Sequence, residues 1–358
     1  RIMVDKKIGS LPIVRERKLV GIVTETDIFR AMAEALGGRA KGLRVAILVP
    51  EKKGEVTEKA LIDSPWVQRL RYIYQLQSAR WVYPSVEHTR FVHSLGTMHV
   101  AGRFARHLYP YLKKVVKDVP SANYVEELLR VTALVHDIGH GPFSHALENS
   151  IVNGVHHEEL SALFMDRLNL DFDGRLTLAL DIFRNAYPKR FLHQLVSGQL
   201  DMDRLDYLNR DSFFTGVSEG VISFDRIIKM LELRSDDLVI EEKGIYSIEK
   251  FIVARRLMYW QVYLHKTVVG AECLLTGILR RAREVAGNDA TLFATPALRT
   301  FLMNRHTSAD FKRDPKLLET FSALDDSDIT TAVKQWTCHE DKVLSDLCSR
   351  LVNRKLFK

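Results

Sequence analysis

The chain has 358 residues, of which 46% are hydrophobic and 27% are charged. This is the composition of a folded protein that is long enough for two or more domains. Its three cysteines are too few and too scattered for a disulfide framework or a cysteine-rich zinc site, which favours a reducing compartment. No apolar run approaches the roughly 18 residues of a membrane span, and no signal peptide is visible. We therefore expect a cytoplasmic protein with no membrane partner.

The net charge of +7 is concentrated at the start of the chain. Residues 1–60 contain 13 lysines and arginines against 8 acidic residues, and the rest of the chain is nearly neutral. Binding to nucleic-acid phosphates needs clustered positive charge rather than a modest sum. Nucleic acid is therefore not expected to be the main partner.

Residues 1–38 predict a small α/β segment with a short opening helix and a strand pair. The later elements are expected at 11–14 (strand), 19–23 (strand) and 26–36 (helix, closed by two glycines). The pieces GSLPIV and GIVTETDIFRAM resemble the second half of a CBS motif, an adenosine-nucleotide-sensing module. In that family the position of Thr24 contacts phosphate and that of Asp27 the ribose. The motif's opening strand is missing, so a purely structural remnant is the alternative.

Residues 39–58 carry the run RVAILVP, whose β-branched residues predict a strand followed by a turn. This stretch resembles the opening strand and turn of an ACT-type regulatory domain. Such a domain would continue further, whereas here the pattern becomes helical by Leu61. We therefore place a boundary near residue 58 and expect a truncated or recombined regulatory segment before it.

From residue 59 to 358 the pattern is predominantly helical. Apolar residues recur every three or four positions over 66–76, 91–112, 122–136, 158–168, 174–186, 190–200, 203–211, 248–285 and 328–352. The only strands expected there form a hairpin in LVIEEKGIYS, with its turn at Lys243–Gly244. The predicted fold is thus mainly α: a helical bundle with a small β-hairpin, preceded by a short α/β regulatory fragment.

A dense group of ionisable side chains lies in LVHDIGHGPFSH, residues 134–145. His136 and Asp137 are adjacent, and the glycines and proline that follow should end the helix that carries them. An imidazole beside a carboxylate at a helix end suits a divalent metal. Two adjacent ligands cannot fill a coordination sphere, so the remaining ligands must come from elsewhere in the chain.

Other segments offer those ligands. His93 lies at the start of a predicted helix, and Asp203 begins a helix face that continues with Tyr207 and Asp211. A histidine, a His-Asp pair and an aspartate form a mixed nitrogen and oxygen site that suits Mn, Fe, Ni, Co, Mg or Zn.

Arginines near these segments indicate the substrate. Arg90 precedes His93, and Arg255 repeats with Tyr259 and Tyr263 every four residues. A planar guanidinium binds phosphate oxygens in pairs, so these arginines match a phosphoryl substrate. Together with the metal ligands they predict hydrolysis of a phosphate ester.

The motifs RFVHSLG, LVHDIGHGPFSH and DMDRLDYLNRD, in this order, resemble those of HD-domain phosphohydrolases, specifically the deoxynucleoside triphosphate triphosphohydrolase branch. The resemblance covers residues 61–358. It implies four metal ligands: His93, His136, Asp137 and Asp203. It also implies that His145 donates a proton to the leaving sugar oxygen, that Glu148 orients a catalytic histidine, and that His140 and His157 contact phosphate.

The resemblance also implies a substrate pocket. Its phosphate-binding positions hold three arginines: Arg90, Arg255 and Arg204, the last in place of the family's usual lysine. The positions that hold the sugar 3′-hydroxyl are Gln75 and Asp211, and those that crowd the 2′ position are Tyr207 and Tyr263. Tyr259 stands where some relatives carry histidine, so the resemblance does not define the base contacts.

The reaction implied is attack of water on the α-phosphorus of a dNTP, dGTP among them, giving a deoxynucleoside and inorganic triphosphate. Metal and arginine charge would stabilise the transition state, and protonated His145 would assist departure of the 5′ oxygen. The segment DSPWVQRLR also resembles the family's activating-nucleotide site, with Asp63, Gln68 and Arg71 at guanine-contacting positions. A homo-oligomer, dimer or tetramer, is expected on the same ground.

Two other interpretations stay open. One is a nucleotide-sensing regulatory or nucleic-acid-binding protein whose HD centre only senses, which the N-terminal fragments favour and His145 opposes. The other is a phosphatase that acts on another phosphate ester. The chain has no Gly-rich GKS or GKT loop, which excludes the common NTPase route to triphosphate chemistry.

Overall fold

The chain divides into two compact units, residues 1–59 and 60–358. The computed structural model describes residues 10–15, 18–24, 58–115, 122–148, 150–152, 154–289 and 291–357. Among the described residues of the first unit, β1 (Ser10–Arg15) pairs antiparallel with β2 (Lys18–Thr24). The two strands predicted there are therefore present. The side chain of Thr24, all of Asp27, the helix predicted at 26–36 and the ACT-like strand lie outside the described part.

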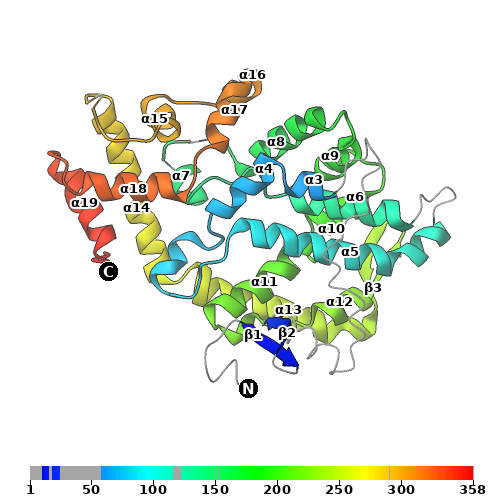
Figure 1. The fold of residues 1–358 in the computed structure, drawn as a ribbon. Coiled ribbons are helices and arrows are strands. Elements are labelled where there is room, and N and C mark those ends of the chain that lie inside the picture. Colours follow the sequence, from blue (N-terminus) through cyan, green and yellow to red (C-terminus); the bar gives the residue numbers. More distant parts are fainter. Residues whose placement is uncertain are drawn as a thin grey trace. The chain divides into compact units, whose positions relative to one another are not determined.

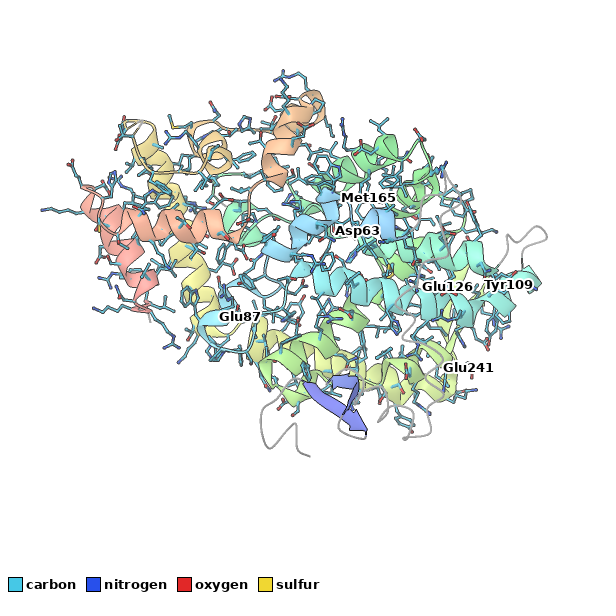
Figure 2. All side chains as sticks on the ribbon, in the orientation of Figure 1. Asp63, Glu87, Tyr109, Glu126, Met165 and Glu241 are labelled. Carbon is cyan, nitrogen blue, oxygen red and sulfur yellow. The ribbon has the colours of Figure 1, made fainter. Side chains whose placement is uncertain are left out.

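The second unit is a helical bundle built around one long helix, α5 (Arg90–Val115) (Figure 1). The apolar side chains of α5 recur every three or four residues and are buried against α6 (Ala122–Val135) and α11 (Met202–Thr215). At the rim, Glu126 of α6, labelled in Figure 2, forms an ion pair with Arg106 of α5. This packing brings the start of α5, the end of α6 and the start of α11 together.

The remaining elements surround these three helices. Before α5 lie α3 (Glu58–Ile62), α4 (Pro65–Gln68) and 3₁₀ turns at Arg69–Tyr72 and Gln77–Trp81. Between α6 and α11 lie α7 (Ser144–Glu148), α8 (His157–Asp171), α9 (Thr177–Phe183) and α10 (Arg190–Val196). After α11 come a 3₁₀ turn at Ser218–Gly220, α12 (Phe224–Lys229), β3 (Leu231–Arg234), β4 (Asp237–Ile240) and α13 (Ile245–Met258). The last helices are α14 (Lys266–Ala286), α15 (Pro296–Met303), α16 (Ser308–Arg313), α17 (Pro315–Ser322), α18 (Asp326–Trp336) and α19 (Lys342–Val352).

The prediction of a mainly α fold is confirmed, but the hairpin turn predicted at Lys243–Gly244 is wrong. β3 pairs antiparallel with β4, and the turn between them is Ser235–Asp236, with φ of +50° and +72°. Positive φ at both central residues is the geometry of the tight hairpin turn that matches strand twist. Lys243 and Gly244 instead form a 3₁₀ turn that leads into α13. The LVI strand thus pairs with the preceding segment LELR, which also alternates apolar and polar residues.

The long helix expected over 248–285 is interrupted. A π-helical turn at Tyr259–Tyr263 follows α13, and α14 starts only at Lys266, where the His265 side chain accepts from the Thr267 amide at 3.2 Å. The stretch 66–76 is likewise short helical turns rather than one helix. Within the described residues no single helix is long and apolar enough to cross a membrane; the bent pair of residues 242–263 and 266–286 meets that test only jointly, by length and composition.

Candidate active site

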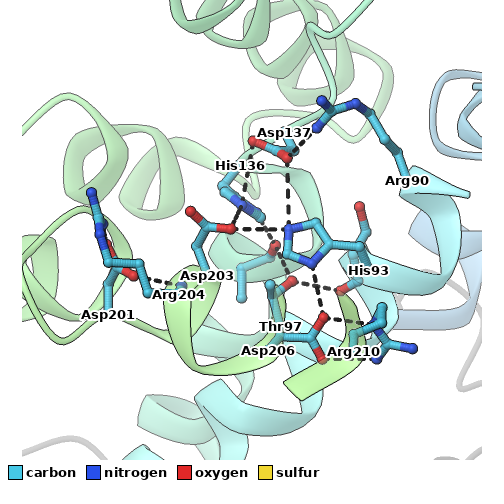
Figure 3. Close-up of polar contacts among 12 residues, drawn as sticks. Arg90, His93, Thr97, His136, Asp137, Asp201, Asp203, Arg204, Asp206 and Arg210 are labelled. Atoms are coloured by element: carbon cyan, nitrogen blue, oxygen red, sulfur yellow. Dashed lines mark hydrogen bonds and ion pairs between the residues drawn. The ribbon is translucent and has the colours of Figure 1, made fainter. Parts of the chain in front are cut away.

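His136 and Asp137 lie on the turn directly after α6, which ends at Val135. Nδ1 of His136 donates to the Ala133 carbonyl at 2.7 Å, and the Thr97 hydroxyl of α5 donates to the same oxygen at 3.1 Å (Figure 3). These bonds fix the turn against α5. They also leave Nε2 of His136 free to face the carboxylates.

His93 lies in the first turn of α5, and its two ring nitrogens have different roles. Nδ1 is 2.8 Å from Oδ2 of Asp206, which in turn binds the Arg210 guanidinium at 2.7 and 2.8 Å. Gly96 permits this approach of α11 to α5, because a Cβ at Gly96 would lie 2.0 Å from Oδ1 of Asp206. A carboxylate behind a metal-binding histidine fixes the tautomer and the ring orientation. Nε2 of His93 is thereby directed into the cluster.

The four predicted metal ligands are brought together in this place (Figure 3). Oδ1 of Asp203, in the first turn of α11, is 3.1 Å from Nε2 of His93 and 3.8 Å from Nε2 of His136. The two carboxylate oxygens of Asp137 are 3.4 Å from Nε2 of His136 and 3.7 Å from Nε2 of His93. α11 is positioned by its own N-cap, Asp201, whose carboxylate accepts from the Arg204 amide at 2.8 Å.

The electrostatics of the cluster are those of tightly paired ions. Burial by itself would lower the pKa of His93, but the close carboxylates of Asp203 and Asp206 outweigh it and raise the pKa to about 10. For Asp203, burial would raise the pKa, and the close imidazole rings of His136 and His93 instead lower it. The cluster therefore favours charged carboxylates at neutral pH.

The residues present fit a divalent metal. Nε2 of His93 and Nε2 of His136 are buried, and neither forms a hydrogen bond of acceptable geometry. Buried polar atoms are normally satisfied, so two unsatisfied imidazole nitrogens beside carboxylates indicate a further ligand between them. Ligand atoms of His93, His136 and Asp203 all lie within 4.8 Å of one another. Mixed imidazole and carboxylate ligation suits divalent first-row metals or Mg.

A second group of side chains adjoins the first. The rings of His140 and His157 stack with centroids 4.0 Å apart, and Nε2 of His140 is 3.5 Å from Oδ1 of Asp137. Nδ1 of His157 donates to Glu148 at 3.1 Å. Burial, followed by the nearby charge of Arg90, lowers the pKa of His140 well below its usual value, so its ring is neutral at neutral pH.

Backbone packing explains this stack. A Cβ at Gly139 would lie 2.2 Å from the Ser161 amide nitrogen and 2.3 Å from the His157 carbonyl oxygen, so only glycine lets the turn touch α8. Nδ1 of His140 is in turn held by the Ser144 hydroxyl at 2.7 Å. The backbone of His145 lies in α7, and its side chain is outside the described part of the chain.

The predicted phosphate-binding arginines are not all in equivalent positions. Arg90, the first residue of α5, donates to Oδ2 of Asp137 at 2.8 Å and so lies beside the cluster. Arg204 instead forms an ion pair with Asp201 and donates to the Gly198 carbonyl at 2.8 Å (Figure 3). The Arg255 guanidinium lies 5.7 Å from the centre of the Tyr259 ring.

The predicted sugar-contacting residues form a connected wall along α11. The Asp211 carboxylate is buried and accepts from Tyr263 at 2.8 Å and from Nε2 of His88 at 2.9 Å. The Tyr263 ring meets those of Tyr207 and Tyr259 edge-on, with centroids 6.0 and 5.2 Å apart. These bonds and ring contacts make one packed surface.

Gln75 joins this wall through the backbone. The backbone N–H of Gln75 donates to the carbonyl of His88 at 3.0 Å, and the side chain of His88 is hydrogen-bonded to Asp211. The side-chain oxygen of Gln75 is buried without a hydrogen-bond partner. That oxygen is therefore available to a ligand hydroxyl.

Comparison with known proteins agrees with this geometry. The chain matches the family model of the HD domain over residues 90–210, that of an HD-associated region over 222–299 and that of the CBS domain over 1–34. A phosphohydrolase of known structure from Bacteroides thetaiotaomicron VPI-5482 is 52% identical, with a TM-score of 0.80 and coverage of 85% of this chain and 75% of that one. The chain belongs to the HD-domain phosphohydrolases. The CBS and HD resemblances seen in the sequence are confirmed.

Curated relatives extend this assignment. An uncharacterized protein of Bacillus subtilis (strain 168) is 35% identical over 83% of this chain and 66% of its own length. The deoxynucleoside triphosphate triphosphohydrolase SAMHD1 homolog of Dictyostelium discoideum is 29% identical over 62% of this chain and 45% of its own length. The chain thus spans less than two thirds of the length of either relative.

Two residues that support the centre of this HD-domain phosphohydrolase were missed from the sequence. The buried Arg69 guanidinium donates to the carbonyls of Ile138 and His140 at 2.9 and 3.0 Å, which holds the turn after α6 in shape. Asp326 of α18 accepts from the amides of Tyr74 and Phe143 at 2.8 and 3.2 Å. Neither contact has a local signal, because the partners are far apart in the chain.

Asp206 and Arg210 were also missed, although the sequence does carry a signal for them. Asp206 follows Asp203 by three residues and precedes Arg210 by four, so all three face the same side of α11. Such spacing beside a metal ligand is the pattern expected of a supporting carboxylate and its counter-ion.

The residues predicted to bind an activating nucleotide are near neighbours on the surface. The Gln68 side chain donates to the Ile62 carbonyl at 2.7 Å and accepts from Nε of Arg71 at 2.6 Å. The Arg71 guanidinium lies 3.7 Å from the centre of the Phe91 ring, and Asp63 is exposed (Figure 2).

Proposed function

We propose that this HD-domain phosphohydrolase cleaves deoxynucleoside triphosphates, dGTP among them, into a deoxynucleoside and inorganic triphosphate. The observation that carries the proposal is the arrangement on α11. Asp203 of the metal cluster is followed one turn later by Tyr207 and one further turn later by Asp211, which Tyr263 holds at 2.8 Å. A phosphate-directed centre and a hydroxyl-recognising wall on one helix face fit a sugar phosphate.

A divalent metal held by His93, His136, Asp137 and Asp203 would supply positive charge to polarise a phosphoryl oxygen. Arg90 lies against Asp137 and has further guanidinium donors for phosphate oxygens. The histidines of the stacked pair act without net charge on His140, as hydrogen-bond partners of the phosphate chain. His145 stays the predicted proton donor to the leaving 5′ oxygen.

The wall supports preference for deoxyribose. The Tyr263 hydroxyl is engaged by Asp211, which fixes its ring, and the Tyr207 ring packs edge-on against it. A rigid aromatic pair leaves little adjustment for an added 2′-hydroxyl. An ionised carboxylate has about four acceptor positions, so Asp211 can take a 3′-hydroxyl besides its two present donors, next to the unpartnered oxygen of Gln75.

The test is incubation of the purified chain with each dNTP, and with the matching ribonucleotides, in Mn²⁺ or Mg²⁺, followed by separation of the phosphate products. We expect inorganic triphosphate and deoxynucleoside from dNTPs and little turnover of ribonucleotides. Asp203→Ala serves as the matched inactive control. Release of orthophosphate instead of triphosphate would reject this substrate and favour a phosphatase acting on another ester.

The second candidate is a nucleotide sensor, which the CBS match over residues 1–34 favours. In that case the same assay yields no product although nucleotides bind. We further propose that Asp63, Gln68 and Arg71 receive an activating nucleotide and that the chain works as a homo-oligomer, dimer or tetramer. Sedimentation with and without nucleotide tests both statements together.

A further inference from the structure

A cavity of about 660 Å³ lies at the C-terminal end of α14. The N-terminal end of the same helix follows Tyr263, one of the predicted sugar-contacting residues. It is lined by Ser150 and Ile151 just after α7, by residues at the end of α14, and by 302–307, which comprise the end of α15 and the loop to α16. Its volume is in the range of small-molecule sites, and none of the predicted site residues lines it.

The charge on this cavity is unbalanced. Arg283, Arg305 and His306 line it, against Glu284 as the one acidic residue among the described lining residues. Glu284 accepts from Arg281 at 2.7 Å, so its charge already has a partner outside the lining. Arg305 is exposed and forms no ion pair within the described part of the chain. Positive charge therefore prevails in the cavity.

Arg283, which lines the cavity, is hydrogen-bonded to backbone carbonyls rather than to carboxylates. Its guanidinium donates to the carbonyls of Ser150 at 2.9 Å and Phe301 at 2.6 Å, and to those of Ile151 and Asn304; among the described residues it forms no ion pair with a carboxylate. Its Nε is buried without a partner. Burial, and after it the charge of Arg305, lowers the pKa of Arg283. An anion between these two arginines would relieve both effects.

We propose that this cavity binds a phosphate-bearing small molecule of nucleotide size, at a site separate from the substrate centre. Arg305 and His306 provide donors for the phosphate, and the unpartnered Nε2 of His306 is one such atom. Ile151, Leu302 and Met303 provide an apolar wall for an uncharged portion of the ligand. Anion recognition by guanidinium groups beside such a wall is the usual chemistry of a nucleotide site.

The cavity is also connected to the substrate centre through Arg283. The carbonyls of Ser150 and Ile151 that it holds follow directly on α7, which packs on α14 and carries Glu148. Glu148 is the carboxylate that holds His157 in the stacked pair. A ligand that fixes Arg283 therefore stabilises the end of α7, and we expect it to alter the hydrolysis rate. This second step rests on the proposed function.

Binding is tested by calorimetry on the full chain, without substrate, with inorganic phosphate, AMP and adenosine as separate probes. Arg305→Ala should weaken AMP binding about tenfold, since it removes charge-assisted hydrogen bonds from an exposed residue, and Arg305→Lys should recover part of it. Arg313→Ala, an arginine 81% exposed on the neighbouring α16, is the matched control and should bind like the parent.

Hydrogen exchange should show AMP-dependent protection of 302–307 in the parent and in Arg313→Ala only. Phosphate binding alone would identify free phosphate as the ligand, and tighter binding of AMP would identify a nucleotide. Equal binding to the parent and Arg305→Ala, or binding of adenosine as strong as that of AMP, would overturn the proposal. An unchanged hydrolysis rate at saturating AMP would reject only the link through α7, and failure of hydrolysis itself would leave the binding result intact.

Discussion

Two groups of predicted site residues are held in place by partly different contacts: the cluster of His93, His136, Asp137 and Asp203, and the wall of Gln75, Tyr207, Asp211 and Tyr263. The cluster is supported partly by neighbours in the sequence: Nδ1 of His136 bonds to Ala133, three residues earlier, and Asp206 and Arg210 lie on the same helix as Asp203. It also depends on the distant Arg69, which holds the carbonyls of Ile138 and His140. The wall depends on distant segments. Gln75 lies in a stretch whose only sheet-like contact among the described residues is the bridge of Tyr74 to Thr89.

The wall is also tied to the end of the chain. Asp326 holds the amide of Tyr74, next to Gln75, and that of Phe143, in the loop before α7. The comparison teaches that the predicted metal ligands all come from short motifs, whereas the stretch around Gln75 also depends on how a late helix, α18, packs on the bundle. Mutations in the two parts should therefore separate metal binding from substrate binding.

The largest effects are expected from substitution of a predicted metal ligand and of the predicted proton donor. Asp203→Ala removes the carboxylate that faces Nε2 of both His93 and His136. Metal content and turnover should both be lost, turnover by about 1,000-fold or more.

His145→Ala should abolish most turnover with metal content intact, because a proton donor contributes on the order of 100- to 10,000-fold. Metal analysis of the purified variants and triphosphate release measure the two outcomes. Normal turnover in His145→Ala would remove that residue from the mechanism.

A smaller effect is expected from the carboxylate behind His93. Asp206→Asn should weaken metal affinity by about 10- to 100-fold with a nearly unchanged melting temperature, because it loosens the orientation of His93 without removing a ligand. Metal titration measures the change. The matched control is Asp211→Asn on the same helix, which should leave metal affinity as it is and raise KM for the dNTP. If both variants behaved alike, the separation of cluster and wall would be wrong.

The smallest effect is a pH dependence of the unfolding free energy that arises from Asp326, whose carboxyl oxygen accepts from the amide of Tyr74, next to Gln75. Asp326 is 4% exposed, and burial raises its pKa from 3.8 to about 7. Between about pH 4 and pH 7 its carboxyl therefore stays protonated in the folded state, whereas it is ionised in the unfolded chain. The stability that it contributes is complete below about pH 4 and is lost as the pH rises toward 7.

Asp326→Asn should remove this dependence. From pH 7.5 to pH 5 the parent should gain about 2 kcal/mol of unfolding free energy relative to the variant, close to one proton over that interval. Denaturant unfolding of both proteins at the two pH values measures it. Parallel behaviour of the two proteins would mean that Asp326 is ionised in the folded state.

Much of this protein could be read from periodicity and motif spacing. The helical class follows from apolar residues at every third and fourth position. The four predicted metal ligands come from three short motifs that resemble a known family, and the structure brings their side chains together. Asp206 and Arg210 could have been found by the same reasoning, since their spacing from Asp203 places them on one helix face. These features are local, and local patterns are visible in a linear sequence.

Other features were decided only by the tertiary structure. The strand partner of β4, the break between α13 and α14, and the contacts of Arg69 and Asp326 depend on which segments pack together. Arg69 reaches Ile138 and Ser322, and Asp326 reaches Tyr74, across 69 to 253 residues of chain. The cavity between Arg283 and Arg305 likewise exists because three separated segments meet. Sequence periodicity does not show which segments pack together, because that packing results from the burial of the whole helical surface rather than from any one segment.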